Sequence, residues 1–153
     1  MKGRWELAIF SGMNVNASGM TAQRLRMDVI SENIANANTT RTREGGAYVR
    51  KNVVLTQKST TGHAFGEVFS RTIGGISTGV KATAVVNDTD TDMNIVYDPS
   101  HPDADEYGYV TYPNVNVVTE MTDLIDATRS YEANATAFEA SKTLALTGLK
   151  LME

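Results

Sequence analysis

The sequence lacks cysteine altogether, has three prolines, and contains no apolar run of about 18 residues or more. Without cysteine it offers neither a disulfide scaffold nor a thiolate metal site. Without a long apolar run we expect no membrane-spanning segment. Leu7 to Phe10 is too short for the apolar core of a cleaved signal peptide, so we expect any export to use another route.

Positive charge is in shorter supply than negative charge, with 14 Lys and Arg against 18 Asp and Glu and a net charge of -4. Nucleic-acid binders usually need a surplus of basic residues for phosphate contacts, so that class is disfavoured. Arg41, Arg43, Arg50 and Lys51 form a local basic patch. On an acidic protein, such a patch predicts a solvated face or one side of a protein contact.

Groups that could act in catalysis are few, because the chain has two histidines, His63 and His101. His63 lies in a Thr-Thr-Gly-His-Ala segment with no neighbour that would activate it. His101 precedes Pro102 and Asp103, and a proline-fixed turn explains this trio better than a metal site. We therefore expect no catalytic residue.

A calcium loop also fails on spacing. Asp88, Asp90 and Asp92 have the alternation of the first three ligands of an EF-hand. The sixth position should be glycine and the twelfth glutamate, but Met93 and Pro99 stand there. We therefore expect no metal and no cofactor.

The last third of the chain, Asn116 to Leu151, predicts a long helix. Apolar side chains follow one another there in steps of four and three, at Val117, Met121, Leu124, Thr128, Tyr131, Ala135 and Phe138. The helix would be about 54 Å long, and its seven-residue repeat favours a supercoil with a partner helix. Asn114 or Asn116 is its predicted cap, with Glu120 and Asp123 suited to the positive end of the helix dipole.

Residues 11–37 predict a first helix with two apolar faces. One face carries methionines and an isoleucine at seven-residue intervals, and the other carries Ala22, Leu25 and Val29. Two apolar faces imply burial from two sides. At about 26 residues, or roughly 40 Å, this helix would be shorter than the second, so we expect the excess to pack on the middle region or on another molecule.

The middle of the chain predicts a small β-rich unit. A polar linker, Thr39 to Gly46, precedes segments with the composition of strands at Tyr48–Thr56, Gly79–Val86, Met93–Tyr97, Tyr109–Tyr112 and, more weakly, Ala64–Ile73. The predicted class is α+β, with long N- and C-terminal helices paired as a coiled coil. Residues 1–38 plus 114–153 would form the terminal-helix domain, and 39–113 the linker and β-rich unit.

Both ends of the chain resemble one family. Ser31–Thr40 (SENIANANTT), Asn114–Met121 (NVNVVTEM) and Arg129–Asn134 (RSYEAN) are similar to the terminal signatures of bacterial flagellar rod and hook proteins. Tyr97–Asp105 (YDPSHPDAD) resembles the short, proximal-rod members. The resemblance covers about residues 9–52 and 79–151. It departs from the family pattern at Met1–Leu7, at Ala47 where proline is common, and at Ser59–Gly75, which is longer than typical.

The resemblance implies a non-enzymatic subunit of the flagellar basal-body rod, the hollow drive shaft used for motility. Such subunits are exported by the flagellar type III apparatus without a cleaved signal and polymerise helically in the periplasm. Implied partners are other copies, the proximal-rod proteins FlgB and FlgF, the distal-rod protein FlgG and the adapter FliE, with no nucleic acid. The alternatives are another rod or hook axial protein or, in a different class, a peptidoglycan-binding or peptidoglycan-hydrolysing domain.

Helical assembly requires different faces toward different neighbours, and the terminal helices would supply them. The predicted interface residues within the coiled coil or between subunits are Met13, Ala17, Met20, Leu25, Met27, Val29, Ile30, Asn33, Ile34, Asn36, Val117, Met121, Leu124, Tyr131, Ala135, Phe138 and Leu149. We expect Asn33 and Asn36 to act as caps or hydrogen-bonding groups where the first helix ends.

Overall fold

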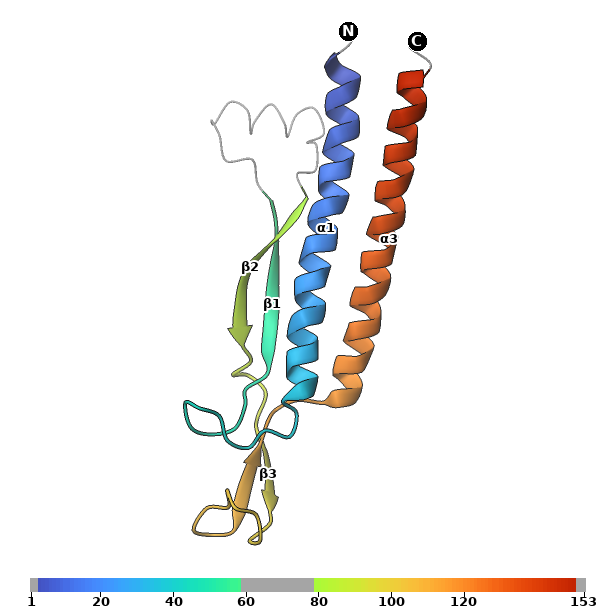
Figure 1. Ribbon diagram of the computed structural model, residues 1–153. Coiled ribbons are helices and arrows are strands. Elements are labelled where there is room, and N and C mark those ends of the chain that lie inside the picture. The colour runs from blue at the N-terminus through green and yellow to red at the C-terminus, as the bar shows by residue number, and fades with distance from the viewer. Residues whose placement is uncertain (1–2, 59–78, 151–153) are drawn as a thin grey trace, which may run out of the picture. The chain divides into compact units, whose positions relative to one another are not determined.

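A computed structural model describes residues 3–58 and 79–150, with side chains from residue 12 onward (Figure 1). The elements in chain order are α1 Gly3–Ala35, β1 Lys51–Gln57, β2 Val80–Asn87, β3 Asn94–Tyr97, β4 Tyr109–Tyr112 and α3 Val117–Lys150. The α+β class with two long terminal helices is thus confirmed. His63, the weak strand prediction at Ala64–Ile73 and the long segment Ser59–Gly75 lie outside the described residues.

The predicted start of the first helix was wrong. α1 begins at Gly3 and has 33 residues, so it matches the 34 residues of α3, and the expected difference in length disappears. Asn14 and Ser18, which suit a helix cap, lie inside α1. Ser18 Oγ donates to the carbonyl of Val15 at 2.7 Å, the local bond that lets a serine remain within a helix. No proline interrupts this stretch, so nothing stops the helix from extending toward the N-terminus.

The predicted helix boundaries nearer the centre of the chain are confirmed. Asn36 Nδ2 donates to the carbonyl of Glu32 at 2.9 Å just after α1 ends. Asn116 Oδ1 accepts the backbone N–H groups of Val118 at 3.0 Å and Thr119 at 3.3 Å, so Asn116 is the cap of α3.

The described residues belong to two compact units, and each unit contains part of both helices. The first draws on Met1–Arg24, Leu55–Thr83 and Thr128–Glu153, and the second on Leu25–Val54 and Ala84–Ala127. The predicted division into a terminal-helix domain and a β-rich domain stays a prediction.

In the first unit, small side chains allow α1 to approach its neighbours. A Cβ added to Gly19 would lie 2.9 Å from Oδ1 of Asn134 on α3, so the two helices are close there. Ser18 Oγ also accepts the N–H of Val80 at 3.1 Å, which ties the start of β2 to α1. Gly79, with φ of 89°, sits directly against this hydroxyl. The serine–glycine pair therefore sets the distance between strand and helix.

In the second unit the core is small and mixed. Val29 and Ile30 of α1 are buried with Tyr48 and with Ala127 of α3. β3 and β4 form an antiparallel hairpin in which Asn94 pairs with Tyr112 and Tyr97 with Tyr109. Two of the three largest fully buried side chains, Glu120 and Asn33, are polar. Polar groups in such positions must be hydrogen-bonded to be tolerated.

β1 and β2 form a second two-stranded sheet. Neither of the helices in the described part of the chain is long and apolar enough to cross a membrane.

Replacing Gly79 by alanine should destabilise the protein more than replacing Gly46 by alanine. Both glycines have positive φ, at 89° and 79°, so both variants carry backbone strain of about 1–2 kcal/mol. A methyl group at Gly79 also collides with Ser18, whereas nothing lies within 4 Å of the Cβ position of Gly46. Overpacking of that kind costs about 1–3 kcal/mol more. Urea unfolding followed by circular dichroism measures the free energy of unfolding of both variants. Equal decreases in the two variants would contradict the contact between Gly79 and Ser18.

Candidate functional site

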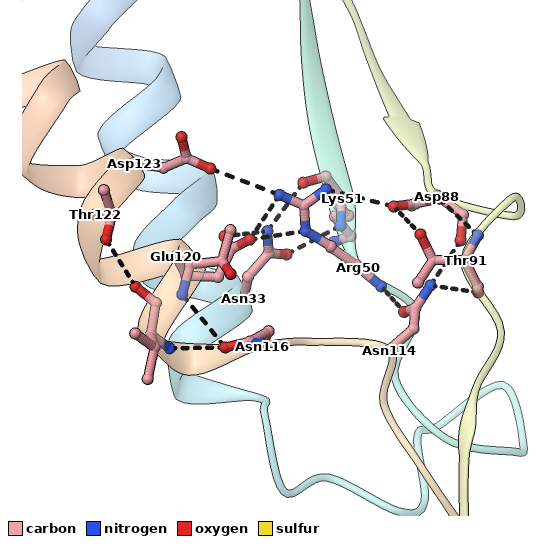
Figure 2. A network of polar contacts seen from close by, with 12 residues as sticks. Asn33, Arg50, Lys51, Asp88, Thr91, Asn114, Asn116, Glu120, Thr122 and Asp123 are labelled. Atoms are coloured by element: carbon pink, nitrogen blue, oxygen red, sulfur yellow. Dashed lines mark hydrogen bonds and ion pairs between the residues drawn. The ribbon is translucent and has the colours of Figure 1, made fainter.

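The most organised group of side chains is a buried polar network in the second unit (Figure 2). At its centre Asn33, 1% exposed, uses its whole amide. Nδ2 donates to the carbonyl of Lys51 at 2.9 Å and to Oε2 of Glu120 at 3.0 Å. Oδ1 accepts from the N–H of Lys51 and from Tyr48 Oη, both at 2.9 Å. Asn33 thus pairs with both backbone groups of Lys51, as a neighbouring strand would.

Arg50 is the cationic partner of this network. Its Nε and Nη2 each lie 2.7 Å from Oε1 of Glu120, a carboxylate that is fully buried. Nη1 lies 3.3 Å from Oδ2 of Asp88, and Nη2 lies 3.8 Å from Oδ2 of Asp123. A guanidinium suits this role because its planar fork presents several donors at once.

Asn114 connects the backbone around the network. Its Oδ1 accepts the N–H of Arg50 at 2.8 Å, and its Nδ2 donates to the carbonyls of Asp88 at 2.9 Å and Thr91 at 3.1 Å. Asp88 in turn accepts the Thr91 hydroxyl at 3.0 Å. Asn114 is thus not the cap of α3; it holds the turn after β2 against the start of β1.

The environment shifts the pKa values of the ionisable groups in ways that favour the observed charges. Burial raises the pKa of Tyr48 to about 12, and the negative charges of Glu32 and Glu120 add to the shift. Burial alone would lower the pKa of Arg50, but its hydrogen bonds and attraction to Glu120 and Asp88 outweigh this and raise it. Burial would raise the pKa of Asp88, but hydrogen bonds from Thr91 and other donors lower it overall. A neutral phenol and a charged pair are therefore the stable forms.

Chemically this arrangement supports structure rather than catalysis. The carboxylate of Glu120 and the amide of Asn33 are saturated by partners within the chain, so neither is open to a substrate. Asp88 accepts from Arg50, Thr91 and Asp90 and is not arranged as a calcium ligand. His101 Nδ1 accepts the N–H of Asp103 at 3.1 Å, as the predicted turn requires. Within 3–58 and 79–150, no three His, Cys, Asp or Glu side chains could hold a metal ion.

The less exposed positions of α3 include most of the predicted stripe. Buried or half-buried positions along the helix are Glu120, Asp123, Leu124, Ala127, Thr128, Ser130, Tyr131, Asn134, Ala135, Phe138, Ser141 and Ala145. Five stripe residues are in this set: Leu124, Thr128, Tyr131, Ala135 and Phe138. Val117 and Met121, also predicted for the stripe, are 40% and 54% exposed. Glu120 and Asn134 are polar members of the set, and an apolar pattern does not detect them.

On α1 the predicted interface residues divide by burial. Val29, Ile30 and Asn33 are buried within the chain. Half-buried positions are Met13, Ala17, Met20, Leu25, Met27, Ile34 and Asn36, and on α3 Leu124, Tyr131, Ala135 and Phe138 share that state. Leu149 is exposed. Their role between subunits stays a prediction.

The predicted basic patch separates into two parts. Arg50 lies in the network and Lys51 Nζ pairs with Oε1 of Glu32 at 2.5 Å, so both serve the fold. Arg41 approaches Oδ1 of Asp103 at 3.5 Å with its side chain 77% exposed, and Arg43 is exposed. Only the second pair of residues presents charge to a partner.

Comparisons with known proteins agree with this architecture. The family described as Flagella basal body rod protein matches residues 13–41, and the family described as Flagellar basal body rod FlgEFG protein C-terminal matches residues 107–151. The flagellar basal-body rod protein FlgC of Borreliella burgdorferi is 40% identical over 152 residues, which are 96% of this chain and 99% of the relative. The FlgC of Bacillus subtilis is 43% identical, over 95% of this chain and 99% of its own length.

The chain belongs to the FlgC family of flagellar basal-body rod proteins. The more distant FlgC of Escherichia coli O6:H1 is 34% identical and still covers 95% of this chain. FlgC proteins are structural components of the rod and are not known as enzymes. Membership of this family confirms the resemblance seen in the terminal signatures. The matches give no support to a peptidoglycan-binding or peptidoglycan-hydrolysing domain.

The structure gives this FlgC-family chain a physical reason for its two signatures. Asn33 lies in the first signature, whereas Asn114, Asn116 and Glu120 lie in the second. Asn33 and Glu120 meet directly at 3.0 Å, 87 positions apart in sequence. Sequence reasoning assigned Glu120 only to the helix dipole and did not anticipate this contact. The one available signal was that a buried polar residue on each helix would need a partner.

Replacing Glu120 by glutamine should lower the free energy of unfolding by about 3 kcal/mol. The change removes the buried charge that compensates the half-buried Arg50, and breaking a buried pair typically costs 3–5 kcal/mol. The loss should fall at the low end because Asp88 and Asp123 remain near the guanidinium. The matched control is Asp126→Asn at an exposed position of α3, expected within about 0.5 kcal/mol of wild type. Similar stability of both variants in urea unfolding would contradict a structural role for the pair.

Tyr48 should make stability depend on alkaline pH. The pKa of Tyr48 rises from 10.0 to about 12 on folding. Its contribution to the free energy of unfolding is therefore full below pH 10 and is lost as the pH rises toward 12. Tyrosinate absorbance should show one phenol titrating near 12. That phenol should vanish in Tyr48→Phe and persist in Tyr107→Phe, an exposed control. Tyr48→Phe should also lose about 1 kcal/mol at neutral pH with the hydrogen bond to Asn33. An unchanged titration curve in Tyr48→Phe would refute the assignment.

Proposed function

We propose that the chain is a structural subunit of the proximal rod of the flagellar basal body, which polymerises helically through its terminal helices into the hollow drive shaft used for motility. The observation that carries this proposal is an apolar surface of α3 left uncovered by α1. Val118 is 74%, Met121 54% and Ile125 53% exposed. In the other unit, Leu144, Leu146 and Leu149 are exposed on the same helix.

This surface is suited to association by its chemistry. Burying one large apolar side chain contributes about 1.5–3 kcal/mol. Several together therefore match the free-energy cost of the translational and rotational freedom that is lost on association. The face that lies against α1 and the uncovered face point in different directions around α3, because Glu120 and Met121 are neighbours on a helix. A subunit with different faces for different neighbours forms an open filament when the contacts do not close into a ring.

The similarity to rod proteins supports a proposal for the environment of the subunit. We place it in the periplasmic part of the basal body, reached through the flagellar type III export apparatus without a cleaved signal. Its neighbours there would be further copies of itself, FlgB, FlgF, FlgG and FliE. The support is the full-length similarity to flagellar basal-body rod proteins of the FlgC family.

A charge on the uncovered face of α3 should prevent assembly without unfolding the subunit. In Ile125→Asp, burial at an interface would require removing a carboxylate from water, whereas the isolated subunit keeps that position in solvent. Introduced into the source bacterium in place of its own copy, this variant should abolish swimming and leave no rods in isolated basal bodies.

The matched control is Ala137→Asp, which introduces the same charge at an exposed position of α3 that faces away from Val118, Met121 and Ile125. It should retain motility. Circular dichroism of both purified variants should match wild type. Normal rods built from the Ile125→Asp protein would show that this face is not an assembly surface.

A further inference from the structure

The β3–β4 hairpin presents a second surface that the terminal helices do not explain. Ile95 and Tyr97 are each 63% exposed, Tyr107 is 78% exposed, and Tyr109 stands beside Tyr97 with their rings 5.3 Å apart. Tyrosine side chains carry much of the binding energy at protein interfaces, because they offer apolar area and a hydroxyl with few rotatable bonds. All four residues of β3 are exposed. Apart from Val110, which is fully buried, the large apolar side chains of the two strands are therefore largely exposed.

The loop that joins the two strands is nevertheless rigidly ordered. Asp98 Oδ1 accepts the N–H of Ser100 at 3.1 Å and its hydroxyl at 2.6 Å. Asp105 Oδ1 accepts the N–H groups of Tyr107 at 2.9 Å and Tyr109 at 2.8 Å. A surface that is ordered before binding loses less entropy when a partner arrives.

Charge indicates what kind of partner fits. Residues 82–128 contain ten of the 18 acidic residues and neither lysine nor arginine. Arg50 forms ion pairs with Asp88, Glu120 and Asp123, and Arg41 forms one with Asp103. Among the residues that the structure describes, Asp105 and Glu106 beside Tyr107 take part in no ion pair. An acidic surface with an aromatic centre calls for a basic partner.

The same unit offers such a basic surface on the loop between α1 and β1. Arg43 is exposed and, within the described ranges, has no ion pair; Arg41 is 77% exposed and only loosely paired. This loop holds its shape through the bonds of Thr42 N–H to Gly46 O at 2.8 Å and of Gly45 N–H to Thr42 O at 3.1 Å. Acidic and basic surfaces on one chain are complementary between copies.

We propose that the hairpin loop of one copy, residues 98–109, docks onto the Arg41–Arg43 loop of a second copy. Tyr107 forms the apolar centre of the contact, and Glu106 pairs with Arg43. The two surfaces differ, so the contact is heterologous and adds a link between successive subunits beyond the helical one. The inference rests on the proposed function, because it presumes that copies meet in a polymer.

A charge exchange on the full-length protein tests the contact. Glu106→Lys and Arg43→Glu should each weaken self-association at least about fivefold in sedimentation velocity, because each places like charges opposite one another. Both changes in one chain should restore association close to wild type, since the pair is re-formed with opposite polarity. Tyr107→Ala should weaken association about tenfold or more through loss of the central side chain.

The control is Asp126→Lys, an equal charge change at an exposed position of α3 that lies on a different face from Val118, Met121 and Ile125. It should leave self-association within about twofold of wild type. Circular dichroism should show all variants folded, because Glu106, Arg43 and Tyr107 are exposed.

Unchanged association in the single variants, or failure of the double variant to recover association, would overturn the inference. Lost motility of the single variants with normal self-association would also overturn it, because it would assign the hairpin to a contact with a different rod protein. Ile125→Asp in the same assay separates the two proposals. If it abolishes association while the hairpin variants do not, the hairpin contact is wrong and helical assembly stands. If Ile125→Asp has no effect, assembly through the uncovered face of α3 fails.

Discussion

The buried pair of Arg50 and Glu120 is the interaction on which the second unit depends. A carboxylate that is fully removed from water is costly unless its charge is matched and its oxygens are hydrogen-bonded, and here both conditions are met by Arg50 and Asn33. The pair joins α1, β1 and the first turn of α3, while Asp88 and Asn114 attach the turn after β2. Geometry around a buried charge is strongly specified, since small displacements leave it uncompensated.

This polar centre explains how a chain with so little apolar core holds its form. Apart from Pro113, six apolar side chains among the described residues are buried, and two of them are alanines. The larger apolar side chains of α3, such as Val118 and Ile125, remain at the surface. Directional hydrogen bonds and charge pairs hold the second unit together, and hydrophobic area is left available for contacts between molecules. For a subunit whose role is to polymerise, this division is physically consistent.

Sequence patterns anticipated the elements well and their faces less well. β4 was predicted at its observed bounds, β2 within one residue at each end, and α3 from its true cap at Asn116. α1 was predicted to start eight residues late. The helix continues back to Gly3, and Asn14 and Ser18, residue types that suit helix caps, lie inside it. On α3 the apolar pattern did not detect Glu120 and Asn134, because a hydrophobicity pattern does not count polar residues as inward-facing.

By itself the sequence determined the long helices, the short strands, the absence of thiol chemistry and the family signatures, because periodicity, turn residues and composition act locally and can be read along the chain. The tertiary structure alone decided which asparagine caps α3 and which holds the turn after β2, which acids meet Arg50, and which apolar residues stay in solvent. Those outcomes depend on groups far apart in sequence, such as Asn33 and Glu120, which hydrogen-bond to each other only once the chain has folded.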